Sequence, residues 1–170
     1  MTQNHNLYAA LRAAFPADLD ATAVETVGGA SAGLRYSWRD LDRASAMIAN
    51  LLDALKLPAR SRIAVQVEKS VETLILYLGV LRSGHVFLPL NTAYQAGEIE
   101  YFVGNAEPAV VVCSPGNFGW VSKIAFKAGT GHVFTLGEDR SGTLLERAAH
   151  HADTHVVAHS KADDLGVIIY

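Results

Sequence analysis

The stretch EKSVETLILYLGVLRSGHVFLPLNTAYQAGEIEY, residues 68–101, decides the fold. Ser70 can cap a helix by accepting a hydrogen bond from a free N–H group, and the run Val71–Leu81 is apolar on nearly every side. Gly84 stands where a helix commonly ends in the left-handed conformation. Residues 86–90 then have the length and composition of a strand in a parallel sheet. The stretch therefore predicts a buried helix, a short buried strand and the start of a second helix.

From residue 62 onward, strands and helices are expected to alternate. The expected strands are 63–67, 86–90, 109–113, 132–136 and 165–170, and the helices between them begin near residues 71, 96, 118 and 142. Strands that are separated by helices of this length are parallel, with right-handed crossovers and helices on both faces of the sheet. The sequence therefore predicts a doubly wound, mainly parallel α/β sheet whose ligands lie beyond the carboxyl ends of the strands.

Residues 1–61 predict a helix, an N-terminal β-hairpin and a first long helix. The short amphipathic helix is expected at 6–15, and the hairpin strands flank the Gly-rich segment 28–33. This segment is typical of a hairpin connection, because no Lys-Ser/Thr pair follows it as in a phosphate-binding loop. Ser37 has the pattern of a helix N-cap, and Pro58 prevents the long helix from continuing.

The composition is that of one globular domain. A chain of 170 residues, of which 50% are hydrophobic and 18% charged, can bury roughly 70% of its unfolded surface. Its 14 basic and 17 acidic residues form no run of like charge, which argues against a nucleic-acid partner. The apolar run 71–80 is too short to span a membrane, and the N-terminus has no secretory pattern. We therefore expect a soluble cytoplasmic protein.

Three patterns have both a chemical and a structural interpretation. The lone Cys113 has no disulfide partner and is expected to be a small buried hydrophobe rather than a nucleophile. His151, His155 and His159 have the spacing of metal ligands on a helix, but no helix is expected beyond His151, so a solvated loop is favoured. Gly129-Thr130-Gly131 precedes a strand and cannot open a helix onto a pyrophosphate. We assign no metal site and no dinucleotide site.

Four short motifs resemble those of one enzyme family. They are YSWRDL at 36–41, LPLNTAY at 88–94, NAEPAVVV at 105–112 and DDLGVIIY at 163–170. Each motif alone is weak, but their order and spacing resemble the N-terminal domain of the adenylate-forming (AMP-forming) acyl-CoA synthetases. The segments 68–70 and 88–94 look most like those of malonyl-CoA synthetases within this superfamily. Thr92 stands where most other members have Pro.

Several connecting segments depart from the family pattern. Lys56 stands where a Gly commonly ends the first long helix, Arg60-Ser61 replaces the usual Gly-Asp, and Asn105 replaces an Asp. Because all of these positions lie in connections, they leave the fold assignment intact and say little about the substrate.

The resemblance implies a reaction in two halves. A carboxylate attacks the α-phosphorus of Mg-ATP to give an acyl-adenylate and pyrophosphate, and the thiol of coenzyme A then displaces AMP. In the family, the phosphate-binding loop follows the lead-in that residues 163–170 match, and the metal and nucleotide contacts lie further on. No catalytic and no cofactor-binding residue is therefore carried over to this chain.

Residues 1–170 are accordingly expected to form an N-terminal subdomain, with 62–170 as its alternating β/α units. The implied parent is an acid–thiol ligase that uses ATP, Mg²⁺ and coenzyme A on a small carboxylate, with malonate favoured, and the chain alone is expected to be inactive. Another short or medium-chain carboxylate is an alternative substrate. A non-catalytic α/β binding module that is complete at Tyr170 is the alternative class of protein.

Asn91 and Tyr94 are weak candidates for substrate-binding residues, because they directly follow the carboxyl end of the 86–90 strand. In the structural interpretation, Asn91 caps the loop and Tyr94 packs on the next helix. In the functional interpretation, the two side chains line an acyl or coenzyme A channel. The sequence favours the structural interpretation and leaves the other open.

The last apolar residues, 166–170, are expected to form a buried strand without a covering helix. The chain is therefore expected to be truncated. A sheet edge left uncovered in this way is expected to pair with a second copy of the chain, which would make a homo-oligomer.

Overall fold

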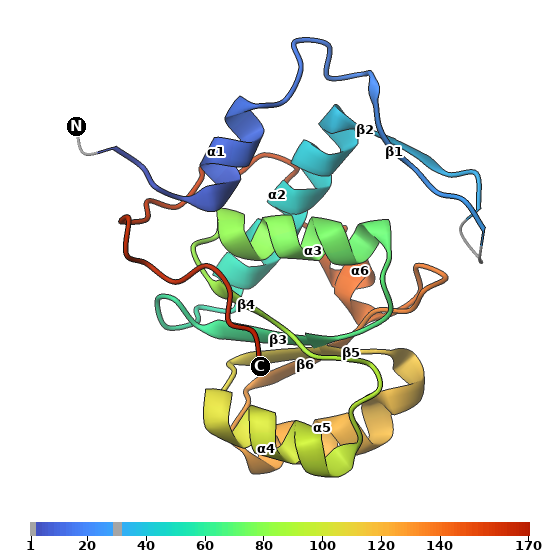
Figure 1. Ribbon diagram of the computed structural model, residues 1–170, viewed down its shortest axis with the longest axis vertical. Coiled ribbons are helices and arrows are strands. Elements are labelled where there is room, and N and C mark those ends of the chain that lie inside the picture. Colours follow the sequence, from blue (N-terminus) through green and yellow to red (C-terminus); the bar gives the residue numbers. More distant parts are fainter. Residues whose placement is uncertain (1–2, 29–31) are drawn as a thin grey trace.

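The computed structural model describes residues 3–28 and 32–170 and confirms the doubly wound α/β fold. Its centre is a four-stranded parallel sheet with the strand order β4-β3-β5-β6 (Figure 1). The strands are β3 (Arg62–Gln66), β4 (Val86–Pro89), β5 (Val110–Cys113) and β6 (His132–Thr135). No helix in the described part of the chain is long and apolar enough to cross a membrane.

Helices cover both faces of the sheet (Figure 1). One face carries α2 (Trp38–Ala54), α3 (Val71–Arg82) and α6 (Thr143–Ala148), and α1 (Leu7–Ala13) packs on α3. The other face carries α4 (Ala96–Ala106) and α5 (Phe118–Lys127), which follows a 3-10 turn, η1, at Pro115–Asn117. Each expected helix is present, so the predicted alternation of strands and helices is confirmed as far as α6.

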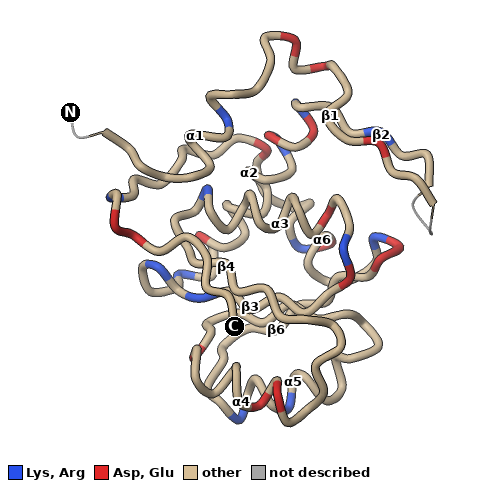
Figure 2. Tube along the Cα trace, in the orientation of Figure 1, with Lys and Arg blue, Asp and Glu red and all other residues tan. Residues whose placement is uncertain are grey.

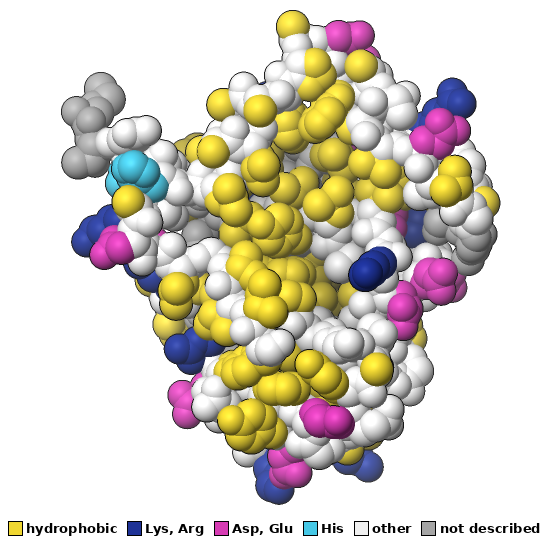
Figure 3. Space-filling view, in the orientation of Figure 1, with side chains coloured by type: hydrophobic (Ala, Val, Ile, Leu, Met, Phe, Trp, Pro, Cys, Tyr) yellow, Lys and Arg dark blue, Asp and Glu magenta, His cyan; other side chains and the backbone are white. Residues whose placement is uncertain are grey.

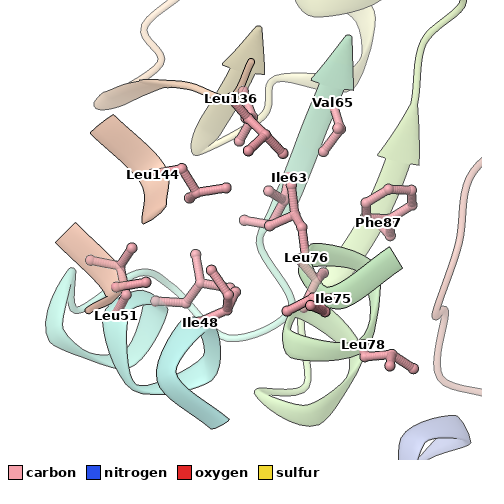
Figure 4. Close-up of a cluster of buried hydrophobic side chains, with 14 of the residues drawn as sticks. Ile48, Leu51, Ile63, Val65, Ile75, Leu76, Leu78, Phe87, Leu136 and Leu144 are labelled. Atoms are coloured by element: carbon pink, nitrogen blue, oxygen red, sulfur yellow. The ribbon is translucent and has the colours of Figure 1, made fainter. Parts of the chain in front are cut away.

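Two hydrophobic cores lie on opposite faces of the sheet, because successive residues of a strand point to opposite sides. Ile63 and Val65 belong to the core under α2, α3 and α6, whereas Ala64 between them belongs to the core under α4 and α5. Figure 4 shows the first core, in which Leu76 of α3 and Leu144 of α6 approach Ile63. These strands are apolar on both faces, as the parallel sheet requires.

The helix starts follow the capping residues in the sequence. The hydroxyl of Ser37 accepts a hydrogen bond from the Asp40 N–H (3.1 Å), and the Asp40 carboxylate accepts one from the Ser37 N–H (2.8 Å). The Ser70 hydroxyl accepts from the Thr73 N–H (3.1 Å) in the same way. Gly84 directly follows the C-cap of α3 and has a φ of 75°. The expected helix boundaries at these residues are confirmed.

The N-terminal hairpin is also present. Strands β1 (Thr22–Glu25) and β2 (Arg35–Ser37) pair antiparallel, and Val24 lies opposite Tyr36. The predicted turn at 28–33 falls in part on residues 29–31, which lie outside the described residues.

Close packing of α2 against α3 depends on a glycine. A Cβ atom added to Gly79 would lie 2.5 Å from Cγ2 of Ile48 and 3.1 Å from the carbonyl oxygen of Ser45. Hydrogen thus takes the place of a side chain at the point where the two helices meet. The run around Gly79 is otherwise large and apolar, so this position sets how near α3 can come to α2.

A buried guanidinium joins helices α1, α2 and α3. Arg82 is 7% exposed, and its Nη1 donates to Tyr8 Oη (2.8 Å) and to Asp42 Oδ1 (2.8 Å). The Tyr8 hydroxyl donates in turn to Asp42 Oδ1 (2.6 Å). Burial and the hydrogen bond to Asp42 raise the pKa of Tyr8 to about 12. The three side chains form one ionic network between helices that are far apart in the sequence.

The segment 151–160 differs from its prediction as a solvated loop. The Asn50 amide donates to the carbonyl oxygens of Ala152 (2.8 Å) and Thr154 (2.9 Å), and Arg82 Nη2 donates to that of His155 (2.7 Å). The His155 side chain is 8% exposed and contacts Asp53 Oδ2 at 2.9 Å. The segment is a loop without helix, as predicted, but it is not solvated throughout, because Asn50 of α2 and the buried Arg82 of α3 bind its backbone.

The last residues differ from the expected strand. Val167 forms a single parallel bridge with Phe87 at the outer edge of β4, and Leu165 and Ile169 are 61% and 79% exposed. The strand prediction for 165–170 was therefore wrong in extent. The segment pairs with β4 on one side only, and a single bridge is too little pairing to hold the rest of the segment as a strand. Figure 3 shows the apolar side chains that gather over α3 and this segment.

We expect Gly79→Ala to lower the free energy of unfolding by about 1–3 kcal/mol, because the new methyl group overlaps Ile48. The matched control is Gly104→Ala in α4, where nothing lies within 4 Å of an added Cβ. This control should raise the free energy of unfolding by about 0.5–1 kcal/mol, since alanine favours helix. Urea denaturation measures both, and equal effects of the two changes would contradict the packing argument.

We expect Asp42→Ala to lower the free energy of unfolding by about 3 kcal/mol near pH 7, because it leaves Arg82 buried without its counter-charge. Burial alone would raise the pKa of Asp42, but hydrogen bonds from Tyr8 and Arg12 hold it below the usual value of 3.8. The contribution of Asp42 is therefore present above about pH 4 and is lost as the pH falls through the lower folded pKa.

Denaturation as a function of pH checks this prediction, and the difference between wild type and Asp42→Ala should narrow in acid. The control is Asp153→Ala, which removes an exposed pair with Arg43 and should cost less than about 1 kcal/mol. A difference that does not change with pH would rule out the ionic role of Asp42.

Candidate functional site

The carboxyl ends of the four strands form one edge of the sheet, and the candidate site lies there. β3 and β5 are neighbours at this edge, where Gln66 lies opposite Cys113. The helices that follow these strands, α3 and α5, pack on opposite faces of the sheet (Figure 1). This arrangement is the topological switch point of a doubly wound sheet, where such sheets bind ligands.

The β4–α4 loop brings the two sequence candidates together in one turn. The Asn91 side chain accepts a hydrogen bond from the Ala93 N–H (2.9 Å), and its carbonyl oxygen accepts from the Tyr94 N–H (3.1 Å). Asn91 is exposed, and the half-buried Tyr94 ring packs on Phe102 of α4 with 5.0 Å between ring centroids. Both residues thus order the loop, and their contact with a substrate stays a prediction.

Gln66, the last residue of β3, binds the backbone of this loop. The sequence analysis did not identify Gln66 as a site residue. Its Nε2 donates to the carbonyl oxygens of Asn91 (3.1 Å) and Tyr94 (3.0 Å). The residue is 2% exposed, and its Oε1 is buried without a hydrogen-bond partner among the residues that the structure describes. An unpaired buried acceptor costs about 1–3 kcal/mol. The signal in the sequence that could have indicated this role was a single polar residue at the end of an apolar strand.

A second polar cluster lies at the same edge, on the α3 side. Glu72, in the first turn of α3, accepts a hydrogen bond from the Tyr36 hydroxyl and forms an ion pair with Arg140 Nε (3.1 Å). The Glu72 side chain is 5% exposed, and burial together with this hydrogen bond raises the pKa of Tyr36 to about 12. The cluster ties the hairpin and the β6–α6 loop to the start of α3.

The residues of the Glu72 cluster line a cleft of about 790 Å³ between the hairpin, α2, α3 and α6. The walls are mostly apolar, with Met47, Ile48 and Leu145 among them. Two pairs of its ionic groups bind each other, Arg140 with Glu72 and Arg43 with Asp153, and the Asp40 carboxylate accepts a hydrogen bond from the Ser37 N–H. The cleft therefore offers a ligand mainly shape and apolar surface.

The other chemical candidates have structural roles. Cys113 is fully buried, and burial raises the pKa of its thiol to about 11, which disfavours the thiolate. Within residues 3–28 and 32–170, no group of three or more His, Cys, Asp or Glu side chains is placed to hold a metal ion. Asp153 and His155 instead bind Arg43 and Asp53.

The comparison with known families identifies the class of protein. The family model described as AMP-binding enzyme matches residues 12–170. Because this match covers nearly the whole chain, the chain belongs to the AMP-binding enzyme family. The family expected from the sequence motifs is thereby confirmed.

Solved structures and curated relatives resemble the chain to different degrees. Apo MatB from Rhodopseudomonas palustris shares 41% sequence identity, with a TM-score of 0.91 over 99% of this chain and 32% of that chain. Tyrocidine synthase 1 of Brevibacillus parabrevis is 27% identical over 137 residues, which are 80% of this chain and 12% of the relative. The anthranilate CoA ligase AuaEII, at 15% identity and a TM-score of 0.84, shows the fold alone. The chain thus spans about a third of the MatB chain and less of the synthase.

We expect Gln66→Met to loosen the β4–α4 loop without unfolding the chain. Methionine fills the same volume but lacks the N–H donors, so hydrogen exchange at residues 92–95 should become about tenfold faster. Global stability should change by less than about 1 kcal/mol, because the buried acceptor is removed together with the donors.

The matched control is Asn50→Leu, which removes another amide that holds two backbone carbonyls. This change should speed exchange near residues 152–156 and leave 92–95 unchanged. Exchange at 92–95 that is the same in Gln66→Met and wild type would show that Gln66 does not hold the loop.

Proposed function

We propose that residues 1–170 are the N-terminal subdomain of an AMP-forming ligase that activates a carboxylate with ATP and passes the acyl group to coenzyme A. The observation that carries the proposal is the 41% identity with MatB over 99% of the chain. This likeness includes the carboxyl edge of the sheet, where ligands of this fold class bind. The ATP-bound structure of MatB supports ATP as the nucleotide.

Malonate is the proposed substrate. The segments 68–70 and 88–94 look most like those of malonyl-CoA synthetases, and the second of them forms the ordered β4–α4 loop. The alternative is another short or medium-chain carboxylate, because the described residues at this edge include no assigned partner for a second carboxylate. A non-catalytic binding module is the alternative outside the ligases.

The chain's own contribution to the reaction is proposed to be a rigid wall. Gln66 holds the turn that presents Asn91 and Tyr94 toward the acyl or coenzyme A channel. Mg²⁺ would offset the charge that develops on the ATP phosphates. No described residue is assigned to the nucleotide or to the metal.

The test is an assay of the protein encoded by the complete reading frame, with ATP, Mg²⁺ and coenzyme A. AMP formation should depend on malonate and exceed that with acetate or hexanoate by at least about tenfold. A preference for another acid would replace malonate in the proposal. The absence of carboxylate-dependent AMP formation with every acid would overturn the ligase assignment and favour the binding module.

The roles of Asn91 and Tyr94 are tested in the same enzyme. Asn91→Ala and Tyr94→Phe should each raise the KM for malonate or coenzyme A about threefold to tenfold if the side chains line the channel. Hydrogen exchange of the loop serves as the control for a purely structural effect. Unchanged KM values would leave both residues with the structural role alone.

A further inference from the structure

A second cleft, of about 750 Å³, lies at the opposite, amino end of the sheet. The α2–β3 connection, the α4–β5 connection and the α5–β6 connection form its walls. Lys56, Arg60, Arg62 and His132 line it, together with a single carboxylate, Glu107. Figure 2 shows the basic residues gathered on the α2–β3 connection. The cleft residues carry a net positive charge, whereas the chain as a whole carries a net charge of −3.

Two of these cations occupy strained backbone positions. Lys56 and Arg60 have φ values of 54° and 61°, in the left-handed region that favours glycine. A side chain in this region costs about 1 kcal/mol relative to glycine. Glycine would adopt these φ values without strain, and this chain has a cation at each position. Strain of this kind concentrates where a side chain has a function.

The charge of the cleft is only partly used by the protein itself. Arg60 pairs with Asp164, and Arg62 Nη1 donates to the carbonyl oxygen of Ala106 (2.6 Å) at the C-terminus of α4. In the described part of the chain, neither the Lys56 ammonium nor the His132 ring has a hydrogen-bond or ion-pair partner. Lys56 directly follows the C-cap of α2, so its charge also lies near a helix C-terminus, but unlike Arg62 its side chain makes no hydrogen bond there among the described residues.

We propose that this cleft binds a small multivalent anion that carries phosphoryl groups. Its volume lies in the range of small-ligand sites, about 300–1,000 Å³. Guanidinium groups bind phosphoryl oxygens through paired N–H donors, and a lysine adds a point charge. The site lies at the opposite end of the sheet from the candidate functional site, so it does not depend on the proposed ligase activity.

The experiment is a titration of the ¹⁵N-labelled chain with pyrophosphate at low ionic strength, followed by amide chemical shifts. The shifts should be confined to residues 56–62, 107–109 and 129–132, and added salt should weaken the binding. The test variant is Lys56→Gly with Arg60→Gly, which removes both cations and also relieves backbone strain. This variant should be at least as stable as wild type and should bind pyrophosphate about tenfold more weakly.

The matched control is Glu107→Gly, since Glu107 lines the same cleft with a φ of 46°. It relieves strain in the same way but removes a negative charge, so pyrophosphate should bind more tightly. Citrate distinguishes phosphoryl recognition from charge alone, and equal affinity for citrate would overturn the phosphoryl assignment. Unchanged affinity in the double variant, or shifts outside the cleft, would overturn the site.

Discussion

The buried guanidinium of Arg82 is the interaction on which the arrangement of the first helices depends. A charge that is 7% exposed must find partners within the protein, because unpaired burial costs several kcal/mol. Tyr8 supplies one partner from α1, Asp42 supplies another from α2, and the carbonyl of His155 supplies a third. The hydrogen bonds of the Arg82 guanidinium therefore fix the positions of α1, α2 and the segment 151–160 around α3.

Side-chain amides donate hydrogen bonds to the backbone carbonyls of the irregular segments, as neighbouring strands do within the sheet. A segment without regular structure still has backbone carbonyls that need donors. Gln66 provides them for the β4–α4 loop, and Asn50 provides them for residues 152–154. Both segments are thereby held by side chains of regular elements, Gln66 of β3 and Asn50 of α2. The Oε1 of Gln66 has no hydrogen-bond partner among the described residues, so the hydrogen bonds from Gln66 to the loop come from its N–H donors.

The two ends of the sheet differ in how their charges are used. At the carboxyl end, Glu72 is paired with Arg140 and the polar groups order loops. At the amino end, Lys56 and Arg60 hold cations at left-handed backbone positions; Arg60 pairs with Asp164, whereas Lys56 has no ion-pair partner among the described residues. Paired charges stabilise a scaffold, whereas unpaired ones remain available to a ligand.

The sequence by itself determined the element order, the parallel sheet and the family. Apolar runs such as Val71–Leu81 and caps such as Ser37 and Ser70 act within a few residues, so their pattern can be read along the chain. Only the tertiary structure decided the burial of His155, the single bridge at Val167, the Arg82 network and the role of Gln66. These features depend on which distant residues meet, and no local pattern records the partners of a buried polar group.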